Sequence, residues 1–169
     1  MMSRTQAVLG SALFFLVAPF TLAGVAPWLM THWRLGATYP GVEVVRVFGA
    51  ALVLAGAVIV VDSFARFALQ GRGTPAPVAP PSALVAAGFY RHVRNPMYVG
   101  VISAILGQAM VFSDAGLVLY AAILWSAFHL FVVFFEEPNL AHEFGAAYET
   151  YRAAVPRWVP RLTPWRPDP

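Results

Sequence analysis

The stretch Met97–Phe135, MYVGVISAILGQAMVFSDAGLVLYAAILWSAFHLFVVFF, contains two apolar segments joined by the short turn Ser113–Gly116. Polar residues gather at the outer ends of this hairpin. RHVRNP (residues 91–96) lies before the first segment and EEPN (residues 136–139) follows the second. If both segments cross a membrane, the turn sends the chain back, and the two polar clusters meet at the same membrane face. Polar residues gathered at one face indicate a site.

The composition indicates an integral membrane protein. Of the 169 residues, 59% are hydrophobic and 11% are charged, and the mean hydropathy is +0.67. A soluble domain carries about 25% charged residues. The length suits a single domain spanning residues 1–169. The absence of Cys excludes disulfides and thiolate chemistry, and the net charge of +3 does not indicate a nucleic-acid partner.

Four stretches are candidate transmembrane helices, each of which needs about 20 mostly apolar residues. They run from Ala7 to Met30, from Val44 to Phe67, from Met97 to Phe112 and from Ala115 to Phe135. Pro19 and Pro27 predict kinks in the first. The predicted fold class is therefore an all-α membrane protein with about four transmembrane helices, two of them within residues 1–70.

The arginines orient these helices. With four crossings, the N-terminus, the middle loop and the C-terminal tail share one side, and that side holds all basic residues except Arg34 and Arg46. Basic residues concentrate on the cytoplasmic side of a membrane. The sequence predicts a multi-pass protein of the bacterial inner membrane, with both termini and both polar clusters in the cytoplasm.

The pattern changes after the fourth stretch. From Glu137 to Ala154, apolar residues recur at helical spacing on one stripe, which predicts a C-terminal amphipathic cytoplasmic helix at the membrane surface. Four prolines between residues 156 and 167 exclude a regular helix beyond it. Trp158 and Trp165, placed between arginines, are typical of interfacial anchors.

In the first polar cluster, Asn95 and Pro96 open the third apolar stretch. Pro is favourable in the first helical turn and Asn is a good N-cap, so a helix start by itself explains both. Tyr90 and Tyr98 flank this corner, either as an aromatic belt or as ring faces for a ligand. Gly88 and Gly100 predict close approach of a helix or a ligand to the backbone.

In the second cluster, Glu136 and Glu137 are placed at the end of the fourth stretch. Carboxylates are disfavoured at a helix C-terminus, and at a membrane border they are costly without partners. Arg94 or Arg157 could pair with them in a purely structural arrangement. Alternatively, the carboxylates form a site for a cation or for ribose hydroxyls.

Three polar residues lie inside the apolar stretches. His129 precedes Glu136 by about two helical turns, and it either bonds a neighbouring helix or lines a substrate cavity. Asp62 and Gln108 leave the same alternatives open. No spacing of His, Asp and Glu indicates a metal site.

A longer ordered pattern runs through both clusters. Its residues are Leu84-Val85, Gly88, Tyr90, Arg94, Pro96, Tyr98, Gly100, Glu136-Glu137, Leu140, Phe144-Gly145, Tyr148, Tyr151 and Val155-Pro156. In this pattern the chain resembles the family of isoprenylcysteine carboxyl methyltransferases and phospholipid methyltransferases, which are integral membrane enzymes. The resemblance covers roughly the C-terminal half, so residues 71–169 correspond to the cofactor-binding core.

The resemblance implies transfer of a methyl group from S-adenosylmethionine to a lipophilic or small acceptor. It implies cofactor contacts at Ala83, Leu84, Val85, Tyr90, Asn95, Pro96, Met97, Tyr98 and Glu136. Arg94, Glu136 and Arg157 are predicted as catalytic residues, because an arginine could meet the carboxylate of the cofactor and Glu136 its ribose or ammonium group. His129 is predicted to bind the acceptor.

The chain departs from the family at three positions. The family commonly has His at Asn95, and its eukaryotic carboxyl methyltransferases have His at Ser82 and Arg at Val132. Because that Arg is associated with the prenylcysteine substrate, the acceptor stays open. Two other functions also stay open: an NADPH-dependent membrane reductase of the sterol-reductase type, and a non-catalytic membrane partner protein.

Overall fold

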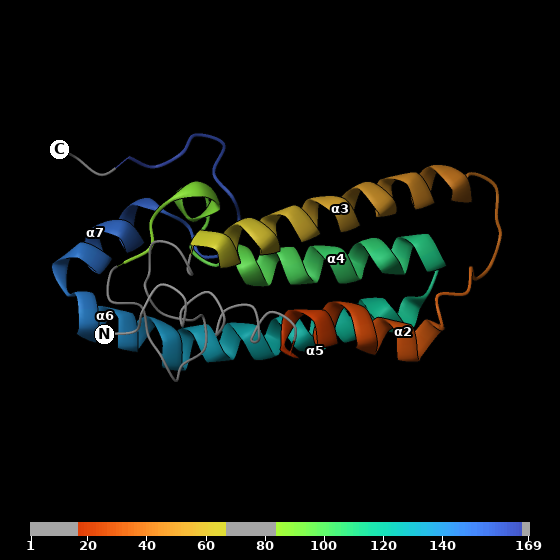
Figure 1. Cartoon of the computed structure of the whole chain (residues 1–169), viewed down its shortest axis with the longest axis horizontal. Coiled ribbons are helices and arrows are strands. Elements are labelled where there is room, and N and C mark those ends of the chain that lie inside the picture. Colours follow the sequence, from red (N-terminus) through yellow and green to blue (C-terminus); the bar gives the residue numbers. More distant parts are fainter. Residues whose placement is uncertain (1–16, 67–83, 167–169) are drawn as a thin grey trace.

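The computed structural model describes residues 17–66 and 84–166. Over these residues the chain is helical, with no β-strand (Figure 1). The elements are η1 (Thr21–Val25, a π-helical turn), α2 (Ala26–Thr31), α3 (Val42–Arg66), η3 (Gly88–Arg91, a 3-10 turn), α4 (Pro96–Phe112), α5 (Ala115–Phe131), η4 (Val132–Glu136, a second π-helical turn), α6 (Glu137–Phe144) and α7 (Ala146–Ala154).

Two helices are long and apolar enough to cross a membrane. They are Val42–Arg66 and the continuous helix Ala115–Phe144, which comprises α5, η4 and α6. Both present large apolar side chains on the outer surface, among them Phe48, Leu119 and Phe134. Such a surface suits lipid, which solvates apolar side chains but not free backbone groups. Helix α4 has 17 residues and spans roughly 25 Å.

Glycines allow α3 and α4 to pack closely in antiparallel directions (Figure 1). A Cβ atom at Gly49 would lie 2.6 Å from the carbonyl oxygen of Gly107, and one at Gly56 would lie 2.5 Å from that of Gly100. Both pairs repeat after seven residues, so they lie on one face of each helix. Small residues of this kind let membrane helices approach closely. The predicted close approach at Gly100 is therefore confirmed, and the neighbour is a helix.

Two prolines each follow a π-helical turn inside a continuous helix. Pro27 follows η1 and Pro138 follows η4, in each case after one intervening residue. A proline cannot donate to the carbonyl four residues earlier, and its ring collides with that carbonyl in a regular α-helix. A π-helical turn contains one extra residue and changes the local geometry. The helices therefore continue through both prolines.

Two carbonyl groups of η1 accept hydrogen bonds from side chains of other helices. Gln108 Nε2 donates to the carbonyl of Ala23 at 2.7 Å, and the Tyr120 hydroxyl donates to that of Leu22 at 3.0 Å. A buried polar group without such a bond is costly. Gln108 therefore serves the fold by bonding a neighbouring helix.

Glu136 and Glu137 do not end a helix, so the sequence-based prediction of their position is wrong. The helix that begins at Ala115 continues through η4 to Phe144. Both carboxylates are therefore several residues away from the nearest helix C-terminus, where the dipole effect is concentrated. The placement of these carboxylates therefore has to be explained by the residues that bind them.

The prediction of a single amphipathic helix between Glu137 and Ala154 is also wrong in one respect. The chain forms two helices, α6 and α7, separated at Gly145. Gly145 has φ = +51°, a backbone conformation that glycine adopts without steric cost. The break lets α7 turn back from α6, so that Tyr148 and Tyr151 are buried.

Residues Val155–Arg166, here called the C-terminal strap, form no helix, as the prolines predict. The strap packs along the loop before α4. The backbone amide of Arg161 donates to the carbonyl of His92, and that of Trp165 donates to the carbonyl of Arg91. Ala83, Ser82, the first part of the first predicted span and the middle loop lie outside the described residues.

Substituting Gly56 by Leu tests the helix contact. We expect the free energy of unfolding to fall by about 1–3 kcal/mol, because the new side chain meets the α4 backbone. Ala50→Leu is the control, since Ala50 is exposed on the same helix. Denaturant unfolding of the detergent-purified protein measures both. Equal stability of the two variants would contradict the packing argument.

Candidate functional site

The two polar clusters meet at one end of the molecule. The start of α4, the α5–α6 junction and α7 converge there, together with the C-terminal strap (Figure 1). The antiparallel hairpin of α4 and α5 produces this meeting, as the sequence predicts.

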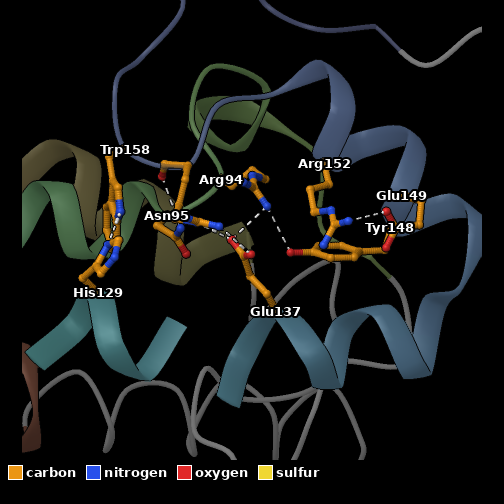
Figure 2. Close-up of polar contacts among 9 residues, drawn as sticks. Arg94, Asn95, His129, Glu137, Tyr148, Glu149, Arg152 and Trp158 are labelled. Carbon is orange, nitrogen blue, oxygen red and sulfur yellow. Dashed lines mark hydrogen bonds and ion pairs between the residues drawn. The ribbon is translucent and has the colours of Figure 1, made fainter. Parts of the chain in front are cut away.

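Glu137 lies at the centre of the meeting point. Its Oε1 lies 2.9 Å from Arg94 Nη1, and its two oxygens accept hydrogen bonds from Arg157 Nε and Nη2 at 2.6 and 2.9 Å. Figure 2 shows Glu137 pointing up from α6 toward Arg94, whose Nη1 also donates to the Tyr148 hydroxyl at 3.2 Å. Glu137 thus joins the start of α4, α6 and the strap.

Because these charged groups are buried, each depends on its partners for stability. Glu137 is 7% exposed, and Arg94 is almost as well buried. An ion buried without partners loses its hydration without compensation. Outside the apolar helices, the hydrogen bond from Arg157 to Glu137 raises the pKa of the Arg157 guanidinium, and burial raises the pKa of the Tyr148 hydroxyl. Both groups therefore stay protonated at neutral pH.

The loop before α4 is fixed to the strap at the same point. The Arg94 amide donates to the carbonyl of Pro156 at 2.9 Å, and Asn95 Nδ2 donates to the carbonyl of Arg157 at 3.2 Å. Asn95 occupies the N-cap position and Pro96 the first turn of α4, but the Asn95 side chain makes no capping bond. The predicted capping role is wrong because the amide is used to hold the strap.

Glu136 has a different environment from its neighbour. Its Oε2 accepts a hydrogen bond from the Tyr98 hydroxyl at 3.0 Å, and among the described residues it has no ion-pair partner. Tyr90 is buried nearby, and burial, followed by the negative charge of Glu136, raises its pKa. The carbonyl of Tyr90 accepts from the Tyr151 hydroxyl at 2.7 Å. A carboxylate without a guanidinium is thus held beside two tyrosines.

His129 lies in an aromatic cluster that the sequence did not predict. Trp158 Nε1 donates to His129 Nδ1 at 3.0 Å (Figure 2), and the Trp125 ring stacks on the imidazole with centroids 5.4 Å apart. Trp158 also lies 6.5 Å from the Tyr98 ring. The accepted bond leaves Nδ1 without a proton, so the neutral ring carries its proton on Nε2.

The other predicted cofactor residues lie in different surroundings. Leu84 packs against the cluster formed by Tyr148, Tyr151 and Val155. Val85 is buried, as are Pro96 and Met97 at the start of α4. Trp158 and Tyr148 were missed as contacts of the site. The i, i+4 spacing of Trp125 and His129 indicates that their side chains are neighbours on one helix. Nothing in the sequence places Trp158 beside them.

Substituting Glu137 by Gln tests the buried ion pairs. We expect a loss of about 3–5 kcal/mol in the free energy of unfolding, because Arg94 stays buried without its counter-charge. Glu149→Gln is the matched control, since Glu149 pairs with Arg152 at the surface and such pairs contribute about 0–1 kcal/mol. Denaturant titration of both variants measures the difference. Similar losses would show that Glu137 is not a structural anchor.

Comparisons with known proteins identify the family of the chain. The phospholipid methyltransferase family profile matches residues 44–147, which is more than half of the chain. Over 80 residues the chain is 37% identical to protein-S-isoprenylcysteine O-methyltransferase of Schizosaccharomyces pombe, covering 47% of this chain and 34% of that protein. Over 73 residues it is 40% identical to methanethiol S-methyltransferase 2 of Bradyrhizobium diazoefficiens, covering 43% and 27%.

The matched segments thus cover between about a quarter and a third of each relative's length. No solved structure matches the chain. The family profile spans α3, α4 and the whole helix that carries Glu136 and Glu137, so it includes most of the site described above. The chain belongs to the phospholipid methyltransferase family.

Proposed function

We propose that the protein transfers a methyl group from S-adenosylmethionine to a lipophilic or small acceptor at the cytoplasmic face of a membrane. The observation that carries this proposal is the unequal pairing of two adjacent carboxylates. Glu137 is neutralised by Arg94 and Arg157, whereas among the described side chains Glu136 is held only by the Tyr98 hydroxyl. Glu136 is therefore the carboxylate that remains for a ligand.

The residues around Glu136 fit the proposed cofactor. S-adenosylmethionine carries a sulfonium, an ammonium group and ribose hydroxyls. An unneutralised carboxylate can bind the ammonium group or the hydroxyls, and Tyr90 and Tyr98 offer ring faces that attract a cation. Leu84, Val85, Asn95, Pro96 and Met97 would complete the contacts, together with Ala83.

The cofactor, when bound, supplies an electrophilic methyl group. Displacement at that carbon depends on alignment of the acceptor and exclusion of water. The protein contributes a carboxylate fixed by Tyr98 and a rigid loop fixed by Asn95 and Arg94. Because Arg94 and Arg157 are engaged by Glu137, we propose that they serve catalysis by positioning this loop and the strap.

The proposed topology has four crossings, with both termini in the cytoplasm of a bacterial cell. The two long apolar helices support it, and the distribution of arginines supports the orientation. Helix α4 and the segment that ends with α2 would supply the remaining crossings. The converging end of the bundle would then face the cytoplasm, where the cofactor is found.

For the acceptor we propose a binding role for His129 and the aromatic rings around it. The related proteins are named for an S-isoprenylcysteine and for methanethiol as acceptors. Val132 is buried in η4, at the position where the family's eukaryotic carboxyl methyltransferases have Arg. A neutral or small acceptor fits this aromatic environment better than a carboxylate.

Titration calorimetry with S-adenosylmethionine and with NADPH tests the cofactor. We expect binding of the former only, weakened about tenfold or more by Glu136→Gln, because one charge-assisted contact is lost. Glu143→Gln, an exposed change on α6, is the control and should bind normally. Absence of S-adenosylmethionine binding by the wild type would exclude the proposed function.

A labelled-methyl assay with methanethiol and with an S-isoprenylcysteine tests the acceptor site. We expect His129→Leu to raise the acceptor KM several-fold without changing the affinity for S-adenosylmethionine, since His129 is remote from Glu136 by about two turns. Ser126→Ala, exposed on the same helix, is the control. An unchanged KM with both acceptors would remove His129 from the site.

A further inference from the structure

A cavity lies beside the end of α3. Its volume is about 680 Å³, and four ionisable side chains line it: Asp62, Arg66, Arg91 and His92. Among the described residues that line it, none belongs to the proposed cofactor set. In the segment from Leu84 to His92, residues 86–89, 91 and 92 line this cavity, whereas Leu84, Val85 and Tyr90 are the residues expected to contact the cofactor.

Arg66 is held in place on one wall. It is the last residue of α3, and its Nε donates to Asp62 Oδ2 at 2.7 Å. Gly88 lies against the guanidinium, and a Cβ atom at this position would overlap it. Gly88 also has φ = +56°, so both its backbone and its missing side chain suit the contact. The predicted close approach at Gly88 is thus confirmed, and the neighbour is the Arg66 side chain.

Arg91 and His92 are held on the other wall by the C-terminal strap. Arg91 Nε donates to the carbonyl of Trp165, and no bond joins its Nη nitrogens to another described residue. His92 Nδ1 donates to the carbonyl of Arg161 at 2.8 Å. The strap therefore fixes both side chains, while the terminal nitrogens of Arg91 remain to bind a ligand.

The charges of the cavity favour an anion. Two guanidinium groups face one carboxylate, and Asp62 is already paired with Arg66. A volume of this size is typical of small-ligand sites, and a guanidinium binds phosphate oxygens through two parallel hydrogen bonds. The cavity also lies at the end of a helix long enough to cross a membrane, which is the level of lipid headgroups.

We propose that this cavity binds a phosphate group, supplied either by the headgroup of an anionic lipid or by free phosphate. Arg91 and Arg66 bind the phosphate oxygens. The site is separate from the methyl-transfer site and does not depend on the proposed function. It would place an anionic lipid beside the loop that carries Tyr90 and Asn95.

Thermal unfolding of the detergent-purified protein, titrated with each ligand, tests this proposal. The probes are dihexanoyl phosphatidylglycerol, dihexanoyl phosphatidylcholine and inorganic phosphate. We expect a saturable rise of the midpoint with phosphatidylglycerol and a weaker effect of phosphatidylcholine. Arg91→Gln and Arg66→Gln should each weaken binding about tenfold, and Arg91→Lys should retain part of it. Arg34→Gln, exposed and distant from the cavity, should bind normally.

The remaining outcomes either identify the source of the phosphate group or refute the proposed site. A rise with inorganic phosphate as well assigns the site to phosphate from either source, and a rise with the lipid alone assigns it to the headgroup. No saturable effect, or equal binding by Arg91→Gln, would refute the proposal. Competition between phosphate and S-adenosylmethionine would also refute it, because the cavity would then belong to the cofactor site. A cooperative thermal transition of Arg91→Gln without ligand checks that the variant is folded.

Discussion

The buried carboxylate of Glu137 is the constraint on which the functional end of the molecule depends. It is held by Arg94 from the loop before α4 and by Arg157 from the C-terminal strap. Three segments far apart in the sequence therefore meet at one carboxylate. Removing the carboxylate would leave the buried Arg94 guanidinium without its counter-charge and next to the partly exposed Arg157, which costs much more than losing a surface pair does. The contact explains why an irregular, proline-rich tail has a defined course.

The π-helical turn η4 decides which glutamate takes this role. An extra residue in one helical turn rotates the side chains of all following residues about the helix axis by roughly 100°. With that change Glu137 points toward Arg94 and Arg157, and Glu136 points toward Tyr98. Pro138, one residue after Glu137, is the local reason for the wider turn. A feature of helix geometry thus divides two adjacent carboxylates into a structural group and a ligand-binding candidate.

Much of the architecture was predictable from pattern. The apolar stretches predict both ends of α3 and α4 and the start of α5 to within two residues, because an apolar run that crosses a membrane must form a helix. Other features could not be read from the sequence. The helix does not stop at Glu136, and α6 and α7 separate at Gly145. Asn95 matches an N-cap by residue type, but its amide is used to bind the Arg157 carbonyl, a long-range contact with no local signal.

The residue pattern is enough to predict that two polar clusters meet at one end of an apolar hairpin, since two antiparallel helices joined by a short turn must bring their outer ends together. The pattern also gives the residue types at that end, and their order identifies the family. Their pairing emerges from the folded arrangement: Arg94 and Arg157 with Glu137, Tyr98 with Glu136, and Trp158 with His129. Which buried groups pair depends on the direction in which each helix presents its side chains and on the course of the strap. Both are set by packing between segments distant in the chain.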